Sequence, residues 1–490
     1  MGMDGWWVES ERLTRPISSS QIGQIMLVMP RAMWLTGMAA GMAVSGLAVL
    51  AGGWTLYVLL ALYLEFKGRR VGTPLKPAGR PPAAEDEAVD PPIDPCLRRE
   101  IVQYHDVVAM LGSPAAGAAV QVLTAVALLG LAVAQILACA TNTYAAVGGD
   151  VPGRAGADSL SKRTYALAWG GAMLAFTAVP SYRDTRVING IALLGTTFTA
   201  WYIVVASKPA AAAAAAAAGL VRLPPTPLGP ASARNFFLGG TIIIGSLSGH
   251  VICMEIFDAL GGSRRFLGAY LLAQVWVLTL TVLPAGVAAS AFGSSLARAD
   301  SIYGVLPPST NRSVSAWLMN VHQVVVFGMV LMPLYYYAER GVGLHGRGAL
   351  GRLTGARRFA ARMCARMPIS LIVWVLALAF PFYGAINALI TAISFPTLSF
   401  LVPCALYNWV YGRRGASGAA ARAAAPFPPP TLGGRVSLRA AWGASLAFNW
   451  VLAVTGFAFM CGALFFSIGA VVSGVRADGV FARCWQCGGL

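Results

Sequence analysis

Charged residues are scarce in this sequence. Of its 490 residues, 57% are hydrophobic and only 11% are charged, whereas soluble domains carry about 25% charged residues. This shortage excludes an ordinary soluble protein, and the apolar runs follow one another with only short breaks. We therefore predict a single all-α integral membrane domain over residues 1–490.

Acidic residues are scarcer than basic ones: 19 Asp and Glu stand against 36 Lys and Arg, for a formal net charge of +17. Such a balance can indicate nucleic-acid binding. Here the arginines lie in loops between apolar runs, where they orient a chain in the bilayer, so we expect no nucleic-acid partner. The segment Met1 to Pro16 has no short apolar core with a cleavage site, and we expect no removable signal peptide.

Catalytic groupings are also lacking. No His, Asp and Cys residues inside the apolar runs have a catalytic or metal-ligand spacing, and His105 and Asp106 are neighbours in a surface segment. We therefore expect no enzyme, no cofactor and no metal site. Of the eight cysteines, Cys484 and Cys487 form a CWQC motif. A CxxC pair can indicate redox chemistry, zinc or a strained disulfide, and we expect either a disulfide or inert thiols.

Eleven apolar runs approach the length of about 20 residues that a membrane-spanning helix needs. The predicted spans are Ile17–Leu35, Met38–Phe66, Ala116–Tyr144, Tyr165–Val179, Val187–Ala206, Phe236–Phe257, Leu267–Phe292, Ser313–Tyr337, Ile369–Phe382, Ala385–Val410 and Ala440–Val472. The segment Leu97–Gly112 is amphipathic and is predicted to lie along the membrane surface. Three loops are predicted to be disordered from their composition: Val71–Pro95, Ala210–Ala218 and Gly415–Pro430.

The basic residues predict the orientation of the chain. A cytoplasmic N-terminus places most of the 36 Lys and Arg residues on the cytoplasmic side, as membrane proteins prefer. Segments 1–16, 71–95 and 411–439 are then cytoplasmic, and segments 207–234 and 473–490 are extracellular. Asn311 begins a glycosylation sequon on the outside. The CWQC motif also faces the outside, where oxidising conditions favour a Cys484–Cys487 disulfide.

Ionisable residues inside predicted spans are rare, and such residues are usually functional. They are Arg31 in the first span, His250 and Glu255 in the sixth, and His322 in the eighth. Arg31 lies about 21 Å along the first helix, at about 1.5 Å per residue. Its guanidinium can bind a substrate carboxylate, pair with Glu255, or reach water through a cavity.

The two histidines and Glu255 are candidates for proton coupling. His250 is the first candidate because its reference pKa is about 6.5, and His322 is the second. Glu255 follows His250 by five residues and can form a salt bridge or a proton relay with it.

Two spans carry signals that interrupt a helix. The first has Pro30 midway, and the sixth has Gly245, Ser246, Ser248 and Gly249 at its centre. These spans occupy corresponding positions if spans 1–5 and 6–10 are inverted repeats. Interrupted helices at corresponding positions indicate a transporter binding site at the midplane, where the ends of the half-helices can hold an anion.

Several stretches resemble the amino acid/auxin permease family and, within it, the plant-type auxin influx carriers. They are QIGQIMLVMP, GGWTLYVLLALYLEF, VAQILACATNTY, VPSYRDTRV, LLGTTFTAWYIVVAS, SGHVICMEIFDAL, VHQVVVFGMVLMPLYYYAERGVGLH, FPFYGAIN and FARCWQC. The resemblance implies a LeuT-type fold of two inverted five-helix repeats plus one span. It also implies proton-coupled import of indole-3-acetate across the plasma membrane.

The resemblance further implies which residues line the pocket: Gln21, Gln24, Val28, Met29, Pro30, Asn142, Ser248, Gly249 and His250. The chain departs from the family at Arg31, where an aromatic residue is usual, at Ser20, where an amide is usual, and at Asp258, where histidine is usual. The expected partners are a small organic anion, protons and the lipid bilayer, with the chain acting as a monomer. The alternatives are a proton/amino acid symporter and a non-transporting ligand sensor on the same fold.

Overall fold

The computed structural model describes eleven stretches of the chain. They are residues 25–71, 102–148, 161–179, 186–247, 249–259, 266–297, 299, 301–345, 350–379, 383–412 and 438–478. Every regular element in these stretches is a helix, and they contain no strand. The prediction of an all-α protein is confirmed. Gln21, Gln24, Ser248, Cys484 and Cys487 lie outside the described residues, as do most of the loops 71–95 and 411–439.

The helices follow the predicted spans closely. In chain order they are α2 (Ile25–Thr36), α3 (Met38–Val71), α4 (Tyr104–Leu111), α5 (Pro114–Ala146), α6 (Lys162–Met173), η2 (Leu174–Ala178), α7 (Arg186–Ala217), α8 (Ala233–Leu247), α9 (His250–Ala259), α10 (Phe266–Phe292), η3 (Gly293–Ala297), η4 (Ile302–Gly304), α11 (Thr310–Gly341), η5 (Leu350–Arg352), α12 (Gly355–Ala379), α13 (Tyr383–Pro396), η6 (Thr397–Leu401), α14 (Val402–Tyr407), η7 (Asn408–Gly412) and α16 (Leu438–Asp478).

Nine helical segments in the described part of the chain are long and apolar enough to cross a membrane. The short helix α2 is also apolar, and the fourth predicted span is divided between α6 and η2. The membrane class is therefore confirmed, while the total of eleven spans stays a prediction.

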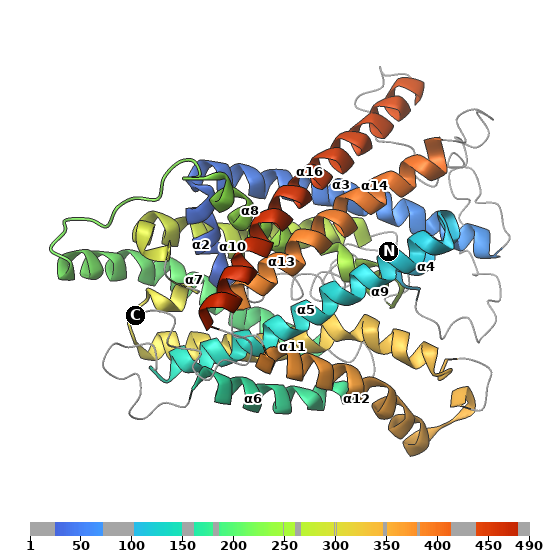
Figure 1. Ribbon diagram of the computed structural model, residues 1–490, viewed down its shortest axis with the longest axis horizontal. Helices are drawn as coiled ribbons and strands as arrows, with labels where there is room; N and C mark the ends of the chain where they lie inside the picture. The colour runs from blue at the N-terminus through green and yellow to red at the C-terminus, as the bar shows by residue number, and fades with distance from the viewer. Residues whose placement is uncertain are drawn as a thin grey trace, which may run out of the picture.

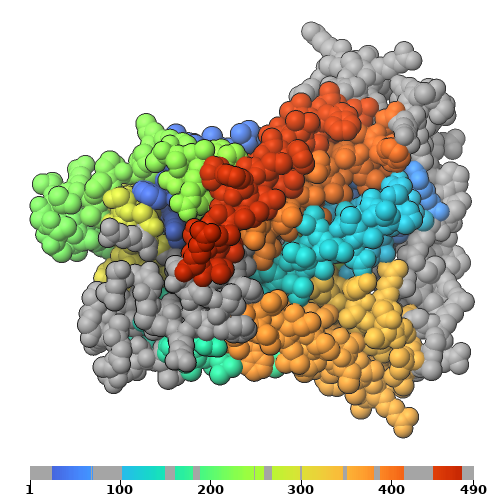
Figure 2. Space-filling view, viewed as in Figure 1, coloured from blue at the N-terminus to red at the C-terminus, as the bar shows by residue number. Residues whose placement is uncertain are grey.

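Helices α5 and α11 form the centre of the bundle. About two-thirds of the most apolar stretch is buried in each (67% and 72%), against 22% in α12 and α16. They pack against one another, and α13 also packs on α5 (Figure 1). Helix α16 lies across the outside of the bundle (Figure 2), where large apolar side chains such as Phe465 are exposed. Such a surface suits contact with lipid tails.

Amide side chains attach α16 to the rest of the protein. Trp54 of α3 donates from Nε1 to Asn449 Oδ1 at 2.7 Å, and Asn449 in turn donates to Asn408 Oδ1 at 3.0 Å. Hydrogen bonds of this kind hold helices together in a bilayer. They are needed because lipid tails are as apolar as the helix surface, so hydrophobic contact alone does not favour helix association.

The sixth predicted span is interrupted, as expected. Helix α8 ends at Leu247 and α9 begins at His250, so the break falls within the Gly- and Ser-rich centre of this span. A break at Pro30 itself is wrong, because α2 continues through this residue from Ile25 to Thr36. Residues 17–24 of the first predicted span lie outside the described residues, so an interruption in that part of the span stays a prediction. Pro30 is buried in α2, and such a proline is tolerated where neighbouring groups satisfy the backbone that it leaves unpaired.

The prediction of disorder in the alanine tract is also wrong. Helix α7 includes Pro209 and continues to Ala217, because alanine has the highest intrinsic helix propensity of all residues. In Figure 1 this green end of α7 projects beyond the other helices on the left. The following segment packs against the start of α3, where the Met38 amide donates to the Pro227 carbonyl oxygen at 2.8 Å.

The apolar face of α4 packs against the protein. Tyr104, Val107, Val108 and Leu111 are buried, and the helix contacts α5. On its other face, Arg340 Nη1 lies 2.8 Å from Asp106 Oδ1. Burial lowers the pKa of His105, with Arg340 adding to the effect and Asp106 opposing it, so this histidine is neutral at pH 7. The position of α4 at the membrane surface stays a prediction.

A buried ion cluster joins α11 to α12. The carboxylate of Glu339 accepts from Arg362 Nε at 2.9 Å, from His345 Nε2 at 2.7 Å, and from Arg366 Nε. Arg366 also donates to the Val179 carbonyl oxygen at 2.6 Å, at the end of η2. Glu339 and Arg366 are almost completely buried. One carboxylate therefore compensates a buried guanidinium and connects three segments of the bundle.

We expect Glu339→Gln to destabilise the protein by about 3–5 kcal/mol, because breaking a buried pair leaves the other charge uncompensated. The thermal unfolding midpoint of the protein purified in detergent should fall by several degrees. The matched control is Arg340→Gln, which removes the more exposed Asp106–Arg340 pair at 2.8 Å and should cost less than about 1 kcal/mol. Equal shifts for the two variants would show that the cluster does not stabilise the bundle.

Candidate functional site

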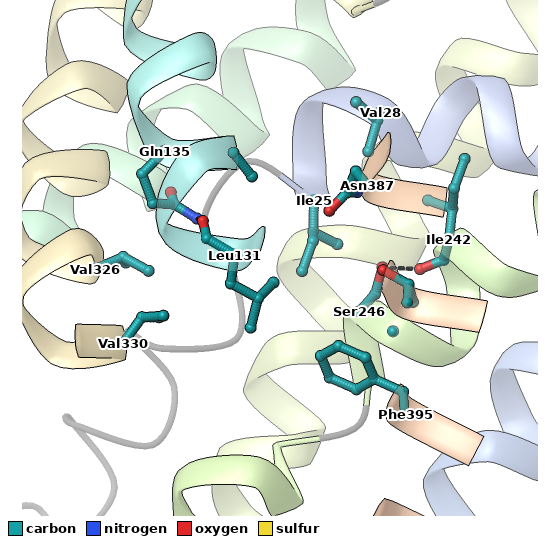
Figure 3. Close-up of a pocket in the computed structure, with 13 residues that line it drawn as sticks. Ile25, Val28, Leu131, Gln135, Ile242, Ser246, Val326, Val330, Asn387 and Phe395 are labelled. Carbon is teal, nitrogen blue, oxygen red and sulfur yellow. Dashed lines mark hydrogen bonds between the residues drawn. The ribbon is translucent and has the colours of Figure 1, made fainter. Parts of the chain in front are cut away.

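A small cavity lies between α2, α5, α8, α11 and α13. It measures about 50 Å³, which is room for a few water molecules. The described residues that line it are Ile25, Val28, Leu131, Ala134, Gln135, Ile242, Gly245, Ser246, Val326, Val330, Asn387, Thr391 and Phe395. Figure 3 shows side chains from these helices converging on one space. We call it the central cavity.

The walls of the central cavity are apolar with a few polar groups. Gln135 donates from Nε2 to the Leu131 carbonyl oxygen at 3.1 Å, whereas its Oε1 is buried without a hydrogen-bond partner. Ser246 Oγ donates to the Ile242 carbonyl oxygen at 2.5 Å (Figure 3). Asn387 and Thr391 add an amide and a hydroxyl from α13. No charged side chain occurs among the described lining residues, so recognition here depends on uncharged hydrogen-bonding groups.

One glycine brings α8 and α13 together at this cavity. A Cβ atom on Gly245 would lie 2.3 Å from Cγ2 of Thr391, a distance that requires the two helices to shift apart. The helical end that precedes the break at 248 therefore needs a glycine to reach its observed position against α13.

His250, the first residue of α9, is fully buried and contacts α3. Its Nε2 lies 3.1 Å from the Gly52 carbonyl oxygen and 2.9 Å from Thr55 Oγ1. Because a carbonyl oxygen can only accept, Nε2 carries the proton of the neutral ring. The second ring nitrogen, Nδ1, is buried without a hydrogen-bond partner. His250 thus joins the interrupted sixth span to α3 and is not among the described residues that line the central cavity.

Glu255 lies on another side of α9 from His250. Five residues at 100° each place the two side chains about 140° apart around the helix. Glu255 accepts a hydrogen bond from the backbone amide of Tyr104 at the start of α4. Asp258 accepts from the Val102 amide at 2.9 Å and lies 3.2 Å from Lys67 Nζ. These two carboxylates of α9 therefore hold the start of α4.

Asn142 and His322 are fully buried away from the central cavity. Asn142 follows Gln135 by seven residues, so both lie on one face of α5 about 10 Å apart along its axis. Neither amide atom of Asn142 has a hydrogen-bond partner among the described residues. His322 lies in α11, next to Ala192 of α7. The roles expected of both residues stay predictions.

The site residues predicted in α2 differ in whether they line the central cavity. Val28 lines the central cavity, and Met29 and Pro30 are buried in the bundle. Arg31 is half-buried and is not among the described lining residues. Gly249, at the break before α9, is also half-buried and not among them. Asn311 is exposed near the start of α11, as a glycosylation acceptor must be, and its modification stays a prediction.

Comparison with known proteins identifies the family. The sequence model of the family described as "Transmembrane amino acid transporter protein" matches residues 95–423. The chain is a member of this transporter family.

Among curated relatives, "Auxin transporter-like protein 3" from Oryza sativa subsp. japonica is 31% identical over 476 residues, which is 96% of this chain and 75% of the relative. "Auxin transporter-like protein 1" from Arabidopsis thaliana is 29% identical over 473 residues, 96% of this chain and 85% of the relative. Among solved structures, a manganese transporter from Eremococcus coleocola has 11% sequence identity and a TM-score of 0.43, over 96% of this chain and 97% of that one.

Three polar residues of the central cavity are not among the predicted site residues. Gln135, Asn387 and Thr391 line the cavity, but they are uncharged and lie away from the two predicted helix breaks. A signal was present, because a polar side chain in the middle of an apolar span also needs a partner. The convergence of α5 and α13 that brings these residues together is not visible in their spacing.

Gly245→Ala should reduce substrate uptake about tenfold, because overpacking a tight contact costs about 1–3 kcal/mol and here it displaces α13 at the cavity. The measurement is initial uptake rate per molecule at the cell surface. Gly46→Ala is the matched control: it lies in helix α3, and a Cβ there would meet nothing within 4 Å. Equal uptake by the two variants would show that the contact with Thr391 does not shape the site.

Proposed function

We propose that this transporter imports a small aromatic carboxylate, indole-3-acetate or a similar acid, together with protons across the plasma membrane. The central cavity supports this proposal most directly. It adjoins the interrupted sixth span, and it combines apolar walls with the amides of Gln135 and Asn387, a lining that suits an aromatic acid. At about 50 Å³ it has room for only a few water molecules in this arrangement, so the proposal requires the surrounding helices to move apart when the substrate binds. Relatives named as auxin transporters over nearly the whole chain support the same substrate class.

The proposal keeps the predicted orientation, with a cytoplasmic N-terminus, an extracellular C-terminus, a monomer as the working unit, and modification at Asn311. It also keeps the predicted disulfide between Cys484 and Cys487. The pocket includes Gln21, Gln24 and Ser248, which precede α2 or separate α8 from α9. Arg31 attracts the carboxylate from its half-buried position on α2.

His250 couples protons to transport in this proposal. Its neutral ring is satisfied at Nε2 by α3, while a second proton on Nδ1 would meet no acceptor in the described arrangement. A buried charge without a partner is costly, so protonation favours a different placement of α9 against α3. Glu255 and His322 are further proton carriers in this scheme.

The free energy available for accumulation can be bounded. Each pH unit across the membrane is worth about 1.4 kcal/mol per proton, and each net charge moved is worth about 2.3 kcal/mol per 100 mV. Import of one proton with one anion is electroneutral and uses the pH gradient alone. A second proton would add the membrane potential.

Symport of a proton and an amino acid is the second candidate function. The family description favours it, and so does the buried Oε1 of Gln135, since a carbonyl oxygen can accept from an ammonium group. The two candidate substrates differ in charge at residue 135: an anion is repelled by a carboxylate there, and an ammonium group is attracted by it.

Gln135→Glu separates the two candidates. A carboxylate here should repel an anionic substrate and reduce indole-3-acetate uptake more than about tenfold, while uptake of an amino acid such as tryptophan should be retained or increased. Gln135→Leu, which removes only the hydrogen bonds, should reduce uptake of either substrate. The measurement is radiolabelled uptake in oocytes at an acidic outside pH.

Gln121→Glu is the control, because Gln121 lies on the same helix and is not among the residues that line the cavity. Unchanged indole-3-acetate uptake by Gln135→Glu would show that the anion does not bind in the central cavity. Retained or increased tryptophan uptake by Gln135→Glu, with no indole-3-acetate uptake by the wild type, would favour the amino acid transporter.

His250→Gln should abolish accumulation driven by a pH gradient while exchange of substrate across the membrane continues. Glutamine can still donate to the Gly52 carbonyl oxygen but cannot take up a second proton. The measurement compares net uptake and counterflow in proteoliposomes. The same substitution at His322 tests the second histidine. Uphill accumulation by His250→Gln would exclude His250 from coupling.

A further inference from the structure

A second cavity lies at the other end of α5, between α5, α6 and the turns that follow α10. It measures about 240 Å³, larger than the central cavity. Six of its lining residues matter here: Thr141, Tyr144, Lys162, Ser295, Ser301 and Tyr303. We call it the α5–α6 pocket. Its lining contains one cation and several hydroxyl groups, and no acidic side chain among the described residues.

Lys162 supplies the charge of this pocket. Its Nζ lies 5.3 Å from the centre of the Tyr144 ring, and no ion pair joins it to a carboxylate in the described part of the chain. Lys162 is the first residue of α6, and the first turn contains no acidic residue. A cation at a helix N-terminus is unfavourable because the helix dipole is positive there. Lys162 therefore does not stabilise α6.

Hydroxyl groups and aromatic rings surround this ammonium group. Thr141, Ser295 and Ser301 bring hydroxyls that can donate to an anion. The Tyr303 hydroxyl lies 2.7 Å from Ser315 Oγ, so this buried residue has its hydroxyl engaged within the protein. A cation beside hydroxyl donors and two aromatic rings is a chemical match for a small aromatic carboxylate.

Helix α5 supplies lining residues to both cavities. Gln135 lines the central cavity, and Thr141 and Tyr144 line the α5–α6 pocket. They lie about 9 and 14 Å further along the helix, at about 1.5 Å per residue. At 100° per residue, Thr141 and Tyr144 lie about 120° and 180° around the helix from Gln135. The two cavities therefore face different sides of α5, at different depths along it.

We propose that the α5–α6 pocket captures the carboxylate substrate before it reaches the central cavity, with Lys162 as the attracting charge. This inference rests on the proposed function. The predicted topology places this end of α5 and the start of α6 on the extracellular side. A fixed charge at the entrance raises the local concentration of an anion and its rate of arrival. Such steering is screened by salt, since the Debye length is about 8 Å at 0.15 M.

The test is uptake of radiolabelled indole-3-acetate by proteoliposomes containing the full-length protein. Lys162→Gln should raise KM about fivefold at low ionic strength and leave kcat unchanged, because the pocket contributes to capture and not to the transport step. Raising the salt concentration should raise the KM of the wild type toward that of the variant, whose KM should change little. Lys162→Arg should restore most of the wild-type KM.

Arg163→Gln is the matched control, because Arg163 is adjacent in α6 and is not among the residues that line the pocket. An equal rise in KM for Arg163→Gln would show a general surface-charge effect and overturn the proposal. A wild-type KM in Lys162→Gln would also overturn it.

Binding measured without transport separates this inference from the proposed function. In the Gln135→Glu background, which disables the central cavity, residual binding of indole-3-acetate should be lost on adding Lys162→Gln. If the wild type takes up no indole-3-acetate, the proposed function fails. The residual binding of indole-3-acetate in the Gln135→Glu background then tests the α5–α6 pocket by itself. Loss of this binding on adding Lys162→Gln supports the pocket, and unchanged binding refutes it.

Discussion

A polar group that is removed from water must find a partner inside the protein, and this constraint organises the bundle. In a bilayer the penalty is severe, so polar side chains gather between helices and seldom face lipid. Here they gather along one face of α5. Gln135 and Asn142 both lie there, buried and with amide oxygens that have no hydrogen-bond partner among the described residues. Native structures rarely leave such groups unsatisfied without a reason. A substrate that passes along α5 would supply the missing partners.

The interruption between α8 and α9 divides the sixth predicted span into two helices. Each side of the break is anchored differently: Gly245 packs tightly on α13, while His250 bonds to α3. Further along α9, Glu255 and Asp258 hold the start of α4. The short helix α9 is therefore attached to two other elements by groups that can change protonation. In the proposed mechanism, a proton arriving at any of them would alter a contact between α9 and its neighbours.

Charge is distributed unevenly through the protein. The central cavity has no charged side chain among its described lining residues, whereas Lys162 lies at the α5–α6 pocket and the Glu339 cluster joins α11 to α12. A fixed cation is useful where an anion is attracted from water. In the proposed function, uncharged amides inside the bundle would hold an anion less firmly and release it more easily. The Glu339 cluster connects helices, and none of its residues is among the described residues that line the central cavity.

The membrane class, the approximate positions of most spans and the break in the sixth span were predictable from the sequence, because they depend on local composition. Several helix ends were not, since α12 begins at Gly355 and α7 continues to Ala217. Long apolar runs require helices in lipid, and the Gly- and Ser-rich stretch before His250 weakens one of them. Two expectations failed for physical reasons. Pro30 is accommodated within α2, and the alanine tract is helical because alanine favours helix without any tertiary contact.

Only the tertiary structure decided which polar residues meet. Gln135, Asn387 and Thr391 are far apart in the chain and come together because α5, α8 and α13 pack closely at small residues. Lys162 and Ser295 meet for the same reason at the α5–α6 pocket. Spacing along one chain determines which residues share a helical face. The packing of several helices determines what that face encounters, and this depends on side-chain volumes across the whole bundle.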